Sequence, residues 1–221
     1  MKENLTEIVF IIDKSGSMFD IAKDTIGGFN SFIESQKKEP GEATLTTVLF
    51  DTECETIHDG VNIKDARLLT REDYRPIGMT ALYDAVGGAI DEVGRRLYET
   101  PEDQRPSKVI FVITTDGLDN ASHEYTRSQV KNMITHQTEK YNWEFMFLGA
   151  NINAEEAATE IGISASMTSA YNATSVGTTA LYSTISNAVS GYRCYGSVDA
   201  NWSEGLANVG EPNINNYTNV L

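Results

Sequence analysis

Oxygen-bearing side chains stand in three short loops that adjoin strongly apolar segments. Asp13, Ser15 and Ser17 lie in the stretch DKSGSM, directly after the apolar run EIVFII. Thr80 precedes the amphipathic stretch ALYDAVGGAIDEVGRRLY, and Asp116 follows the apolar run KVIFVITT. If the three loops converge in the fold, two carboxylates and three hydroxyls meet at one place. The chemistry expected of such a place is cation binding.

The ligand types restrict the cation. Oxygen ligands without His or Cys suit hard cations such as Mg²⁺, Mn²⁺ or Ca²⁺ and disfavour Zn²⁺ and copper, so we take Mg²⁺ as the leading candidate. The alternating spacing of Asp13, Ser15 and Ser17 lets a tight turn direct every second side chain to one point, with Gly16 relieving the crowding. Because hydroxyls are neutral, the protein charge at the metal would come from Asp13 and Asp116 alone. A carboxylate from outside could then replace a bound water as a strong ligand.

Each of these residues also has a simpler explanation. Ser and Asp are favoured at helix N-caps, and on its own the stretch DKSGSM would be assigned that role. Asp116 in TDG is typical of a turn, and Asp119 and Asn120 are best explained as loop and capping residues. Asp84 is best explained as a helix-surface acid, although it lies one turn beyond Thr80 and could support a ligand from there. Only the combination of three loops favours a metal site.

Strand-like and helix-like segments alternate along the chain. Long apolar runs are typical of parallel strands covered on both faces, and apolar residues three to four apart indicate helices. Two short strands around residues 51–54 indicate a hairpin whose second strand lies antiparallel at the sheet edge. The pattern predicts strands at residues 7–12, 44–50, 55–58, 108–115, 143–149 and 167–171, and helices at residues 21–36, 81–98, 125–140, 154–161 and 174–192.

This alternation predicts an α/β fold: a doubly wound, mainly parallel sheet with an antiparallel edge strand and helices on both faces. In such sheets ligands bind at the carboxyl ends of the strands, near the point where the strand order reverses, and the polar loops fall there. The pair Gly87 and Gly88 predicts that the helix at residues 81–98 lies close to the sheet. We expect one domain, residues 1–195, and an irregular tail, residues 196–221, that is rich in Asn and Gly and lacks periodicity.

Charge and composition argue against several classes of partner. With 17 Lys plus Arg against 32 Asp plus Glu, the chain of 221 residues carries a formal net charge of −15. That charge would repel phosphate backbones and anionic lipids, so we expect neither nucleic-acid nor membrane partners. The absence of a long apolar stretch and of a signal-peptide core predicts a cytoplasmic protein. Cys54 and Cys194 lack CxxC spacing and indicate neither a disulfide framework nor a zinc site.

Taken together, the three loops carry a family resemblance. DxSxS after the first strand, Thr80 in GMTALYDAV and Asp116 in TTDG resemble the metal-ion-dependent adhesion site (MIDAS) of von Willebrand factor type A (vWA) domains, in particular the bacterial or phage type. The resemblance implies a Rossmann-like vWA fold. It also implies that Ser15, Ser17 and Thr80 are hydroxyl ligands and that Asp13 and Asp116 act directly or through water.

The resemblance covers roughly residues 5–195 in element order, and the tail beyond them does not align with the family. It implies a protein-binding module whose metal ion is completed by an Asp or Glu of a partner protein. Because bacterial members of the family often work beside ATPases of the MoxR type, such an ATPase system is the partner that the resemblance suggests.

The alternative is a metal-dependent hydrolase or phosphotransferase that uses Asp13 as nucleophile or base. Such an enzyme would be expected to show a further base, a phosphate-binding Lys or a glycine-rich loop, and the sequence has no GxxxxGKS/T or GxSxG motif. We therefore expect a binding module and no enzyme. Lys14, inside the first motif, is predicted to face either solvent or an acidic partner.

Overall fold

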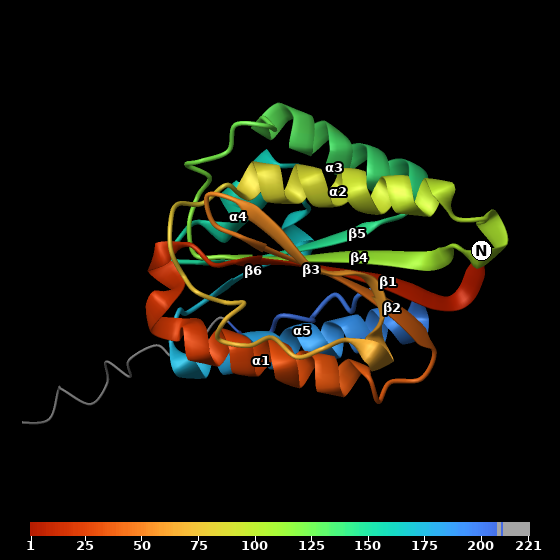
Figure 1. The fold of residues 1–221 in the computed structure, drawn as a ribbon, viewed down its shortest axis with the longest axis horizontal. Helices are drawn as coiled ribbons and strands as arrows, with labels where there is room; N and C mark the ends of the chain where they lie inside the picture. The colour runs from red at the N-terminus through yellow and green to blue at the C-terminus, as the bar shows by residue number, and fades with distance from the viewer. Residues whose placement is uncertain (207–208, 210–221) are drawn as a thin grey trace, which may run out of the picture.

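The chain alternates strands and helices, as the apolar pattern predicts (Figure 1). The computed structural model describes residues 1–206 and 209. The strands are β1 (Lys2–Asp13), β2 (Glu42–Phe50), β3 (Cys54–Asn62), β4 (Pro106–Thr115), β5 (Glu144–Ala150) and β6 (Thr168–Tyr171). The helices are α1 (Ala22–Gln36), α2 (Leu82–Glu99), α3 (Arg127–Tyr141), α4 (Ala154–Glu160) and α5 (Ser175–Tyr195), with short 3-10 helices η1 (Gly16–Ile21), η2 (Ile63–Asp65), η3 (Glu102–Gln104) and η4 (Ala165–Met167).

Within the described residues, the strands form one sheet in the order β3-β2-β1-β4-β5-β6. Neighbouring strands run parallel except β2 and β3, which pair antiparallel and place β3 at the edge. The predicted doubly wound, mainly parallel sheet with an antiparallel edge strand is therefore confirmed. Because β1 pairs with β2 on one side and with β4 on the other, the strand order reverses beside β1. The carboxyl ends of β1 and β4 are thus the place where such folds bind ligands.

Helices cover both faces of the sheet, and Figure 1 shows α2 and α3 on one side and α1 and α5 on the other. The side chains of β1 alternate between the two layers. Ile8, Phe10 and Ile12 pack in the layer of α1 and α5, whereas Val9 and Ile11 pack in the layer of α2 and α3. All five side chains are fully buried. This explains the continuous apolar run, since both faces of a central strand lie in the core.

A buried ion pair fastens the last turns of α2 to the sheet. Glu7 on β1 is buried, and its Oε1 accepts hydrogen bonds from Nη2 of Arg96 at 2.6 Å and from Oγ1 of Thr46 at 2.7 Å. Burial raises the pKa of Glu7, and the guanidinium of Arg96 opposes that rise. Breaking such a pair leaves an uncompensated buried charge, so the pair resists displacement of α2. The position of α2 in turn fixes Thr80, which precedes its first turn.

The prediction that Gly87 and Gly88 bring α2 close to the sheet is wrong. A Cβ at Gly87 would lie 2.4 Å from Cδ1 of Tyr125, whereas a Cβ at Gly88 would meet no atom within 4 Å. Tyr125 precedes α3, and its hydroxyl donates to Asp91 on α2 at 2.7 Å. Gly87 therefore makes room for the ring of Tyr125, which packs against α2 in place of the sheet.

Beyond α5 the described chain continues in turns and packs in part on the core. Nε1 of Trp202 donates to the carbonyl of Ser166 at 2.9 Å, and Leu206 is buried in the layer of α1 and α5. The domain boundary at residue 195 stays a prediction, and the rest of the predicted tail, residues 207–208 and 210–221, lies outside the described residues. Within residues 1–206 and 209, every helix is too short or too polar to cross a lipid bilayer.

Candidate metal site

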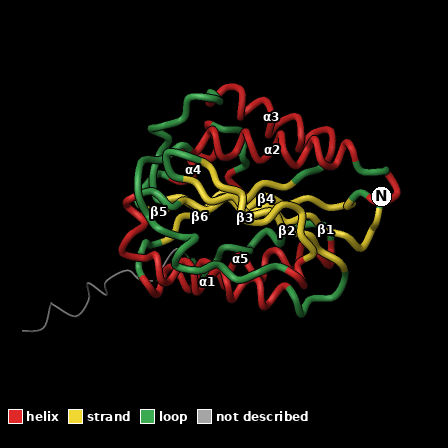
Figure 2. The backbone as a smooth tube through the Cα atoms, in the orientation of Figure 1, coloured by secondary structure: helices red, strands yellow, loops and turns green. Residues whose placement is uncertain are grey.

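Three loops meet at the carboxyl ends of β1 and β4, among the loops at the left edge of the sheet in Figure 2. The first loop follows β1, the second precedes α2 and the third follows β4. The N–H of Gly16 donates to the carbonyl of Gly78 at 3.2 Å and joins the first loop to the second. The N–H of Asn120 donates to the carbonyl of Thr80 at 2.9 Å and joins the second loop to the third. The three loops therefore converge.

Four of the five candidate ligands form a continuous chain of contacts. Asp13 accepts one hydrogen bond at Oδ1 from the N–H of Ser15 and another at Oδ2 from the hydroxyl of Thr115, each at 2.7 Å. The hydroxyl oxygens of Ser15 and Ser17 lie 3.2 Å apart. Ser17 donates in turn to Oδ1 of Asp116 at 2.6 Å, across 99 positions of sequence. Side chains from the ends of two neighbouring strands thus lie in one small cluster.

The fifth candidate, Thr80, stands beside this cluster. Its N–H donates to Oδ1 of Asn120 at 2.8 Å, which fixes the backbone before α2. A Cβ at Gly117 would lie 3.3 Å from Oγ1 of Thr80, so the hydroxyl faces the turn directly after Asp116. A side chain at position 117 would crowd that hydroxyl, which is a physical reason for Gly in TTDG.

The electrostatics of the cluster favour a cation. Asp13 and Asp116 are both buried, with 0% and 7% of their surface exposed. Burial raises the pKa of Asp13 and the nearby charge of Asp116 adds to the rise, while hydrogen bonds from Thr115 and Ser15 oppose it. Two carboxylates in such a place repel each other and are poorly solvated. A divalent cation held by both would offset the repulsion and the lost solvation.

The donor set fits a small, hard cation. Neighbouring ligands in an octahedral shell around Mg²⁺ lie about 3 Å apart, since each metal–oxygen bond is about 2.1 Å long. The 3.2 Å between the hydroxyl oxygens of Ser15 and Ser17 is close to that spacing. Among residues 1–206 and 209, no three His, Cys, Asp or Glu side chains cluster as they would around a metal. A cation at this site would therefore depend on hydroxyl oxygens as well as on the two acids.

Asp84 anchors the third loop, and its interpretation as a helix-surface acid is wrong. The residue is 8% exposed, and its carboxylate accepts the backbone N–H groups of His123, Glu124 and Tyr125 at 2.7 to 2.9 Å. Asp84 lies in the first turn of α2, where a negative charge is also favoured by the helix dipole. The carboxylate thereby attaches the loop after β4 to the helix that follows Thr80.

Asp119 and Asn120 act as loop and capping residues, as the sequence predicts. Oδ1 of Asp119 accepts the N–H of Tyr83 at 3.2 Å, in the first turn of α2. The side chain of Asn120 accepts the N–H of Thr80, and Oγ of Ser122 accepts the N–H of Asp84 at 3.0 Å. The bonds to Tyr83 and Asp84 satisfy N–H groups that the first helical turn leaves unpaired, and the bond to Thr80 fixes the backbone just before the helix.

Two further residues hold Asp13 and are not singled out by the sequence pattern. Oγ1 of Thr115 contacts both the carboxylate of Asp13 and the carbonyl of Gly117, at 2.7 and 3.0 Å. The hydroxyl of Tyr74, which is buried, donates to the carbonyl of Asp13 at 2.5 Å. Because Thr115 stands beside Asp116 in TTDG, the sequence could have indicated that it lies at the site. Tyr74 lies 61 positions from its partner and carries no local signal.

Lys14 turns toward acids of its own chain. Its Nζ lies 3.7 Å from Oδ2 of Asp51 and 3.4 Å from Oε2 of Glu55, and its side chain is 15% exposed. Neither predicted orientation, toward solvent or toward an acidic partner, describes this placement. The ion pairs hold the loop between β2 and β3, together with the start of β3, against the end of β1.

The comparisons with solved structures identify the fold. No protein-family model matches the chain, and no match is found among curated proteins. Solved structures do match: the vWF domain of the type V pili tip protein Mfa5 from Porphyromonas gingivalis gives a TM-score of 0.60 at 10% identity, over 86% of this chain and 96% of that one. The fold is that of a von Willebrand factor type A domain.

Two other structures share the vWA fold and hold metal ions. Proximal thread matrix protein 1 from the mussel byssus, with a zinc-occupied MIDAS motif, gives a TM-score of 0.58 at 14% identity, over 87% of this chain and 46% of that one. The manganese-loaded TRAP protein from Plasmodium vivax gives 0.52 at 15% identity, over 76% of this chain and 69% of that one. This chain thus spans about half the length of the mussel protein, and at these identities the likeness concerns the fold alone.

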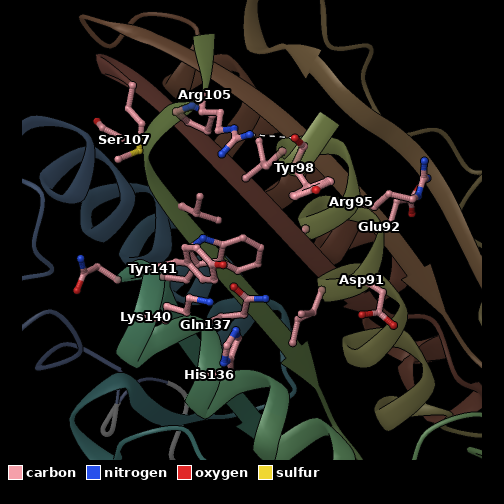
Figure 3. Close-up of a pocket in the computed structure, with 18 of the residues that line it drawn as sticks. Asp91, Glu92, Arg95, Tyr98, Arg105, Ser107, His136, Gln137, Lys140 and Tyr141 are labelled. Carbon is pink, nitrogen blue, oxygen red and sulfur yellow. Dashed lines mark hydrogen bonds between the residues drawn. The ribbon is translucent and has the colours of Figure 1, made fainter. Parts of the chain in front are cut away.

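A cavity of about 1020 Å³ lies at the opposite edge of this vWA fold (Figure 3). It opens between the last turns of α2 and α3, at the amino ends of β4 and β5, and its lining includes Tyr98, Tyr141 and Trp143. None of the five candidate ligands lines it. The candidate metal site lies among loop ends outside this cavity, so the size of the cavity is no guide to the cation chemistry.

Proposed function

We propose that this chain binds a divalent cation at the ends of β1 and β4 and uses it to capture an acidic side chain of a partner protein. The hydroxyls of Ser15, Ser17 and Thr80 would be ligands, and Asp13 and Asp116 would act directly or through water. Mg²⁺ is the proposed cation, with Mn²⁺ and Ca²⁺ as alternatives of the same chemistry. When bound, the cation supplies positive charge and a coordination position that a carboxylate can take from water.

The observation that carries the proposal is the chain of contacts from Asp13 through Ser15 and Ser17 to Asp116. Helix capping does not account for it. Ser15 is the N-cap residue of η1, yet its side chain makes no capping hydrogen bond. Its hydroxyl faces Ser17, whose own hydroxyl reaches the acid of another loop. This arrangement collects oxygen atoms at one point, as a cation requires.

The matched vWA structures support a divalent cation as the ligand. The mussel byssus protein has zinc in its MIDAS motif, and TRAP is loaded with manganese. Both metals are divalent, and the oxygen-only donor set of this chain favours the harder Mg²⁺ over zinc. A cytoplasmic location and a MoxR-type ATPase system as the partner stay predictions from the sequence.

The alternative is a hydrolase or phosphotransferase that uses Asp13, and the neighbouring Lys14 gives it no support. Lys14 would be the residue to hold a phosphate, but its ammonium lies against Asp51 and Glu55. We therefore propose binding and not catalysis as the use of the site.

Acetate is the simplest probe of the proposed carboxylate position. If acetate coordinates Mn²⁺ on the protein, the unpaired electrons of the metal strongly enhance the relaxation of its methyl protons. We expect this enhancement with the Mn²⁺-loaded protein and its reversal by excess Mg²⁺, which is diamagnetic and competes for the site.

The matched variants are Asp13→Asn and Asp20→Asn. Each removes one negative charge near the same edge, but Asp20 is exposed and takes no part in the contact chain. We expect the enhancement to be lost in Asp13→Asn and retained in Asp20→Asn. Equal enhancement in both variants would contradict the proposal, as would its absence in the unaltered protein.

A further inference from the structure

The cavity at the amino ends of β4 and β5 has no part in the proposed function, and aromatic side chains line it (Figure 3). Its volume of about 1020 Å³ is at the upper end of the range for small-molecule sites. Trp143 is 6% exposed, and its ring stacks on that of Phe111 with the ring centres 5.4 Å apart. Tyr98 and Tyr141 are 81% and 51% exposed. These side chains offer flat apolar surfaces on which a planar ring can pack.

A glycine on α2 keeps the space between α2 and α3 open. Beyond its own helix, a Cβ at Gly94 would meet one atom within 4 Å, the amide nitrogen of Gln137 on α3 at 4.0 Å. Packing therefore does not exclude a side chain at position 94, although glycine is disfavoured within helices. Because Gly94 lines the cavity, any larger side chain there would occupy part of it.

Two hydrogen-bond donors in the cavity lining lack acceptors. Of the two tryptophans, Trp202 donates its indole N–H to Ser166, whereas that of Trp143 has no acceptor among the described residues. The N–H of Trp143 is not sealed in the core, so it opens to solvent where Trp143 lines the cavity. The side-chain amide of Gln137 has no partner within residues 1–206 and 209 either. Because a buried Trp N–H usually has an acceptor, a bound molecule is left to supply one.

Two cations in the lining have no carboxylate partner in the part of the chain that the structure describes. Nζ of Lys140, on α3, lies 5.2 Å from the ring centre of Tyr141. Arg105 donates to the carbonyls of Tyr98 and Thr100, at 2.9 and 2.7 Å. Those bonds fix the guanidinium at the end of α2 without neutralising it. The cavity thus combines aromatic surface, free donors and positive charge.

Two of the three acids in the lining lie across the opening from Lys140. Figure 3 shows Asp91 and Glu92 on α2, whereas Lys140 comes from α3. The carboxylate of Asp91 accepts the hydroxyl of Tyr125 at 2.7 Å. The third acid, Glu102, is exposed on η3. Since charges more than about 8 Å apart are largely screened at physiological ionic strength, an anion at Lys140 responds to that ammonium more than to the net charge of the chain.

We propose that this cavity binds a small aromatic carboxylate, with its ring against Trp143 and Tyr141 and its carboxylate at Lys140. The ring supplies apolar burial. The ammonium of Lys140 and the amide of Gln137 donate to the carboxylate, and bonds of this kind are stronger to an ionised acceptor than to a neutral one. The site lies at the opposite edge of the sheet from the candidate metal ligands, so binding requires no cation.

Two probes with the same ring test the proposal, 2-naphthoate and the uncharged 2-naphthamide. Equilibrium dialysis against the whole chain in EDTA measures the dissociation constant of each. We expect one equivalent of 2-naphthoate to bind with a dissociation constant of about 1 mM or tighter. The amide should bind at least about fivefold more weakly, because it lacks the charge that strengthens the hydrogen bonds.

Two pairs of variants locate the probe. Lys140→Met should weaken 2-naphthoate at least about fivefold and leave 2-naphthamide unchanged. Lys131→Met is the matched control, because Lys131 is also exposed on α3 but does not line the cavity. Gly94→Leu fills part of the cavity and should weaken both probes. Gly88→Leu, on the same helix and outside the cavity, should bind both as the unaltered protein does.

Several outcomes would overturn the proposal. Absence of binding, or equal affinity for the two probes, would exclude a site selective for carboxylates. Unchanged 2-naphthoate binding in Lys140→Met or in Gly94→Leu would place the probe elsewhere. Equal losses in Lys140→Met and Lys131→Met would reflect the overall charge of the chain. Dimers in sedimentation that Gly94→Leu abolishes would assign the cavity to a second copy of this chain.

Discussion

Replacing Asp13 with Asn should stabilise the metal-free protein and abolish its response to cations. The carboxylate is fully buried, burial raises its pKa, and Asp116 lies nearby, so loss of the charge relieves desolvation and repulsion. The amide keeps both hydrogen bonds. Its oxygen accepts the N–H of Ser15, and its nitrogen donates to Oγ1 of Thr115. The hydroxyl hydrogen of Thr115 then turns to the carbonyl of Gly117, 3.0 Å away.

The size of the effect follows from this exchange. Because no hydrogen bond is lost, the free energy of unfolding without metal should rise by about 0.5 to 2 kcal/mol, which is usual when a destabilising functional group is removed. For a domain of this size Tm then rises by about 1 to 8 °C. With Mg²⁺ at 100 times Kd, binding stabilises the unaltered protein by about 2.7 kcal/mol. The order of the two Tm values should therefore reverse between EDTA and Mg²⁺.

Thermal unfolding followed by circular dichroism, in EDTA and in Mg²⁺, measures both effects. Asp20→Asn is the control and should respond to Mg²⁺ as the unaltered protein does, because Asp20 is exposed and outside the contact chain. A lower Tm for Asp13→Asn in EDTA would mean that the buried carboxylate stabilises the fold. An equal gain from Mg²⁺ in Asp13→Asn would mean that Asp13 is not at the cation. Either result would refute the reasoning.

Three further predictions concern the frame around the site. Gly88→Ala should stabilise the protein by about 0.5 to 1 kcal/mol, whereas Gly87→Ala should destabilise it, because only a Cβ at position 87 meets Tyr125. Urea unfolding of the two variants measures the difference, and equal effects would disprove the prediction. Asp84→Ala should lower the free energy of unfolding by about 2 to 4 kcal/mol and weaken Mg²⁺ binding, because three backbone N–H groups lose their acceptor. An unchanged midpoint of urea unfolding would count against this role of Asp84. Burial lowers the pKa of His58 below its ordinary 6.5, so the stability that the neutral ring contributes is complete above pH 6.5 and is lost as the pH falls below it. Stability should then fall more steeply from about pH 7 to about pH 5 than in His58→Gln, and equal slopes would contradict the assignment.

The sheet could be predicted where strands are buried on both faces. β4, β5 and the second half of β1 contain nearly continuous apolar runs, and such runs are typical of strands between two helical layers. Strand ends were predicted less well. β1 begins at Lys2 and β3 extends to Asn62, several residues beyond the predicted bounds. These end residues pair through their backbones while their side chains are largely exposed, so no apolar pattern marks them.

The convergence of the candidate ligands could be predicted because each adjoins a recognisable strand or helix. The long-range contacts that hold them in place could not. Asp84 bonds backbone groups 39 to 41 positions away, and Tyr74 bonds Asp13 across 61 positions. Such contacts depend on how α2 and the loops pack against the sheet. A local sequence pattern does not reveal that packing. The prediction that Gly87 brings α2 close to the sheet was wrong for the same reason.

Isothermal titration of Mg²⁺ into the metal-stripped protein, beside Asp13→Asn and Asp20→Asn, tests the central claim most directly. We predict saturable binding at one site in the unaltered protein and in Asp20→Asn, and no binding in Asp13→Asn. Absence of binding in the unaltered protein, or equal binding in all three, would contradict the claim that the ends of β1 and β4 form a cation site.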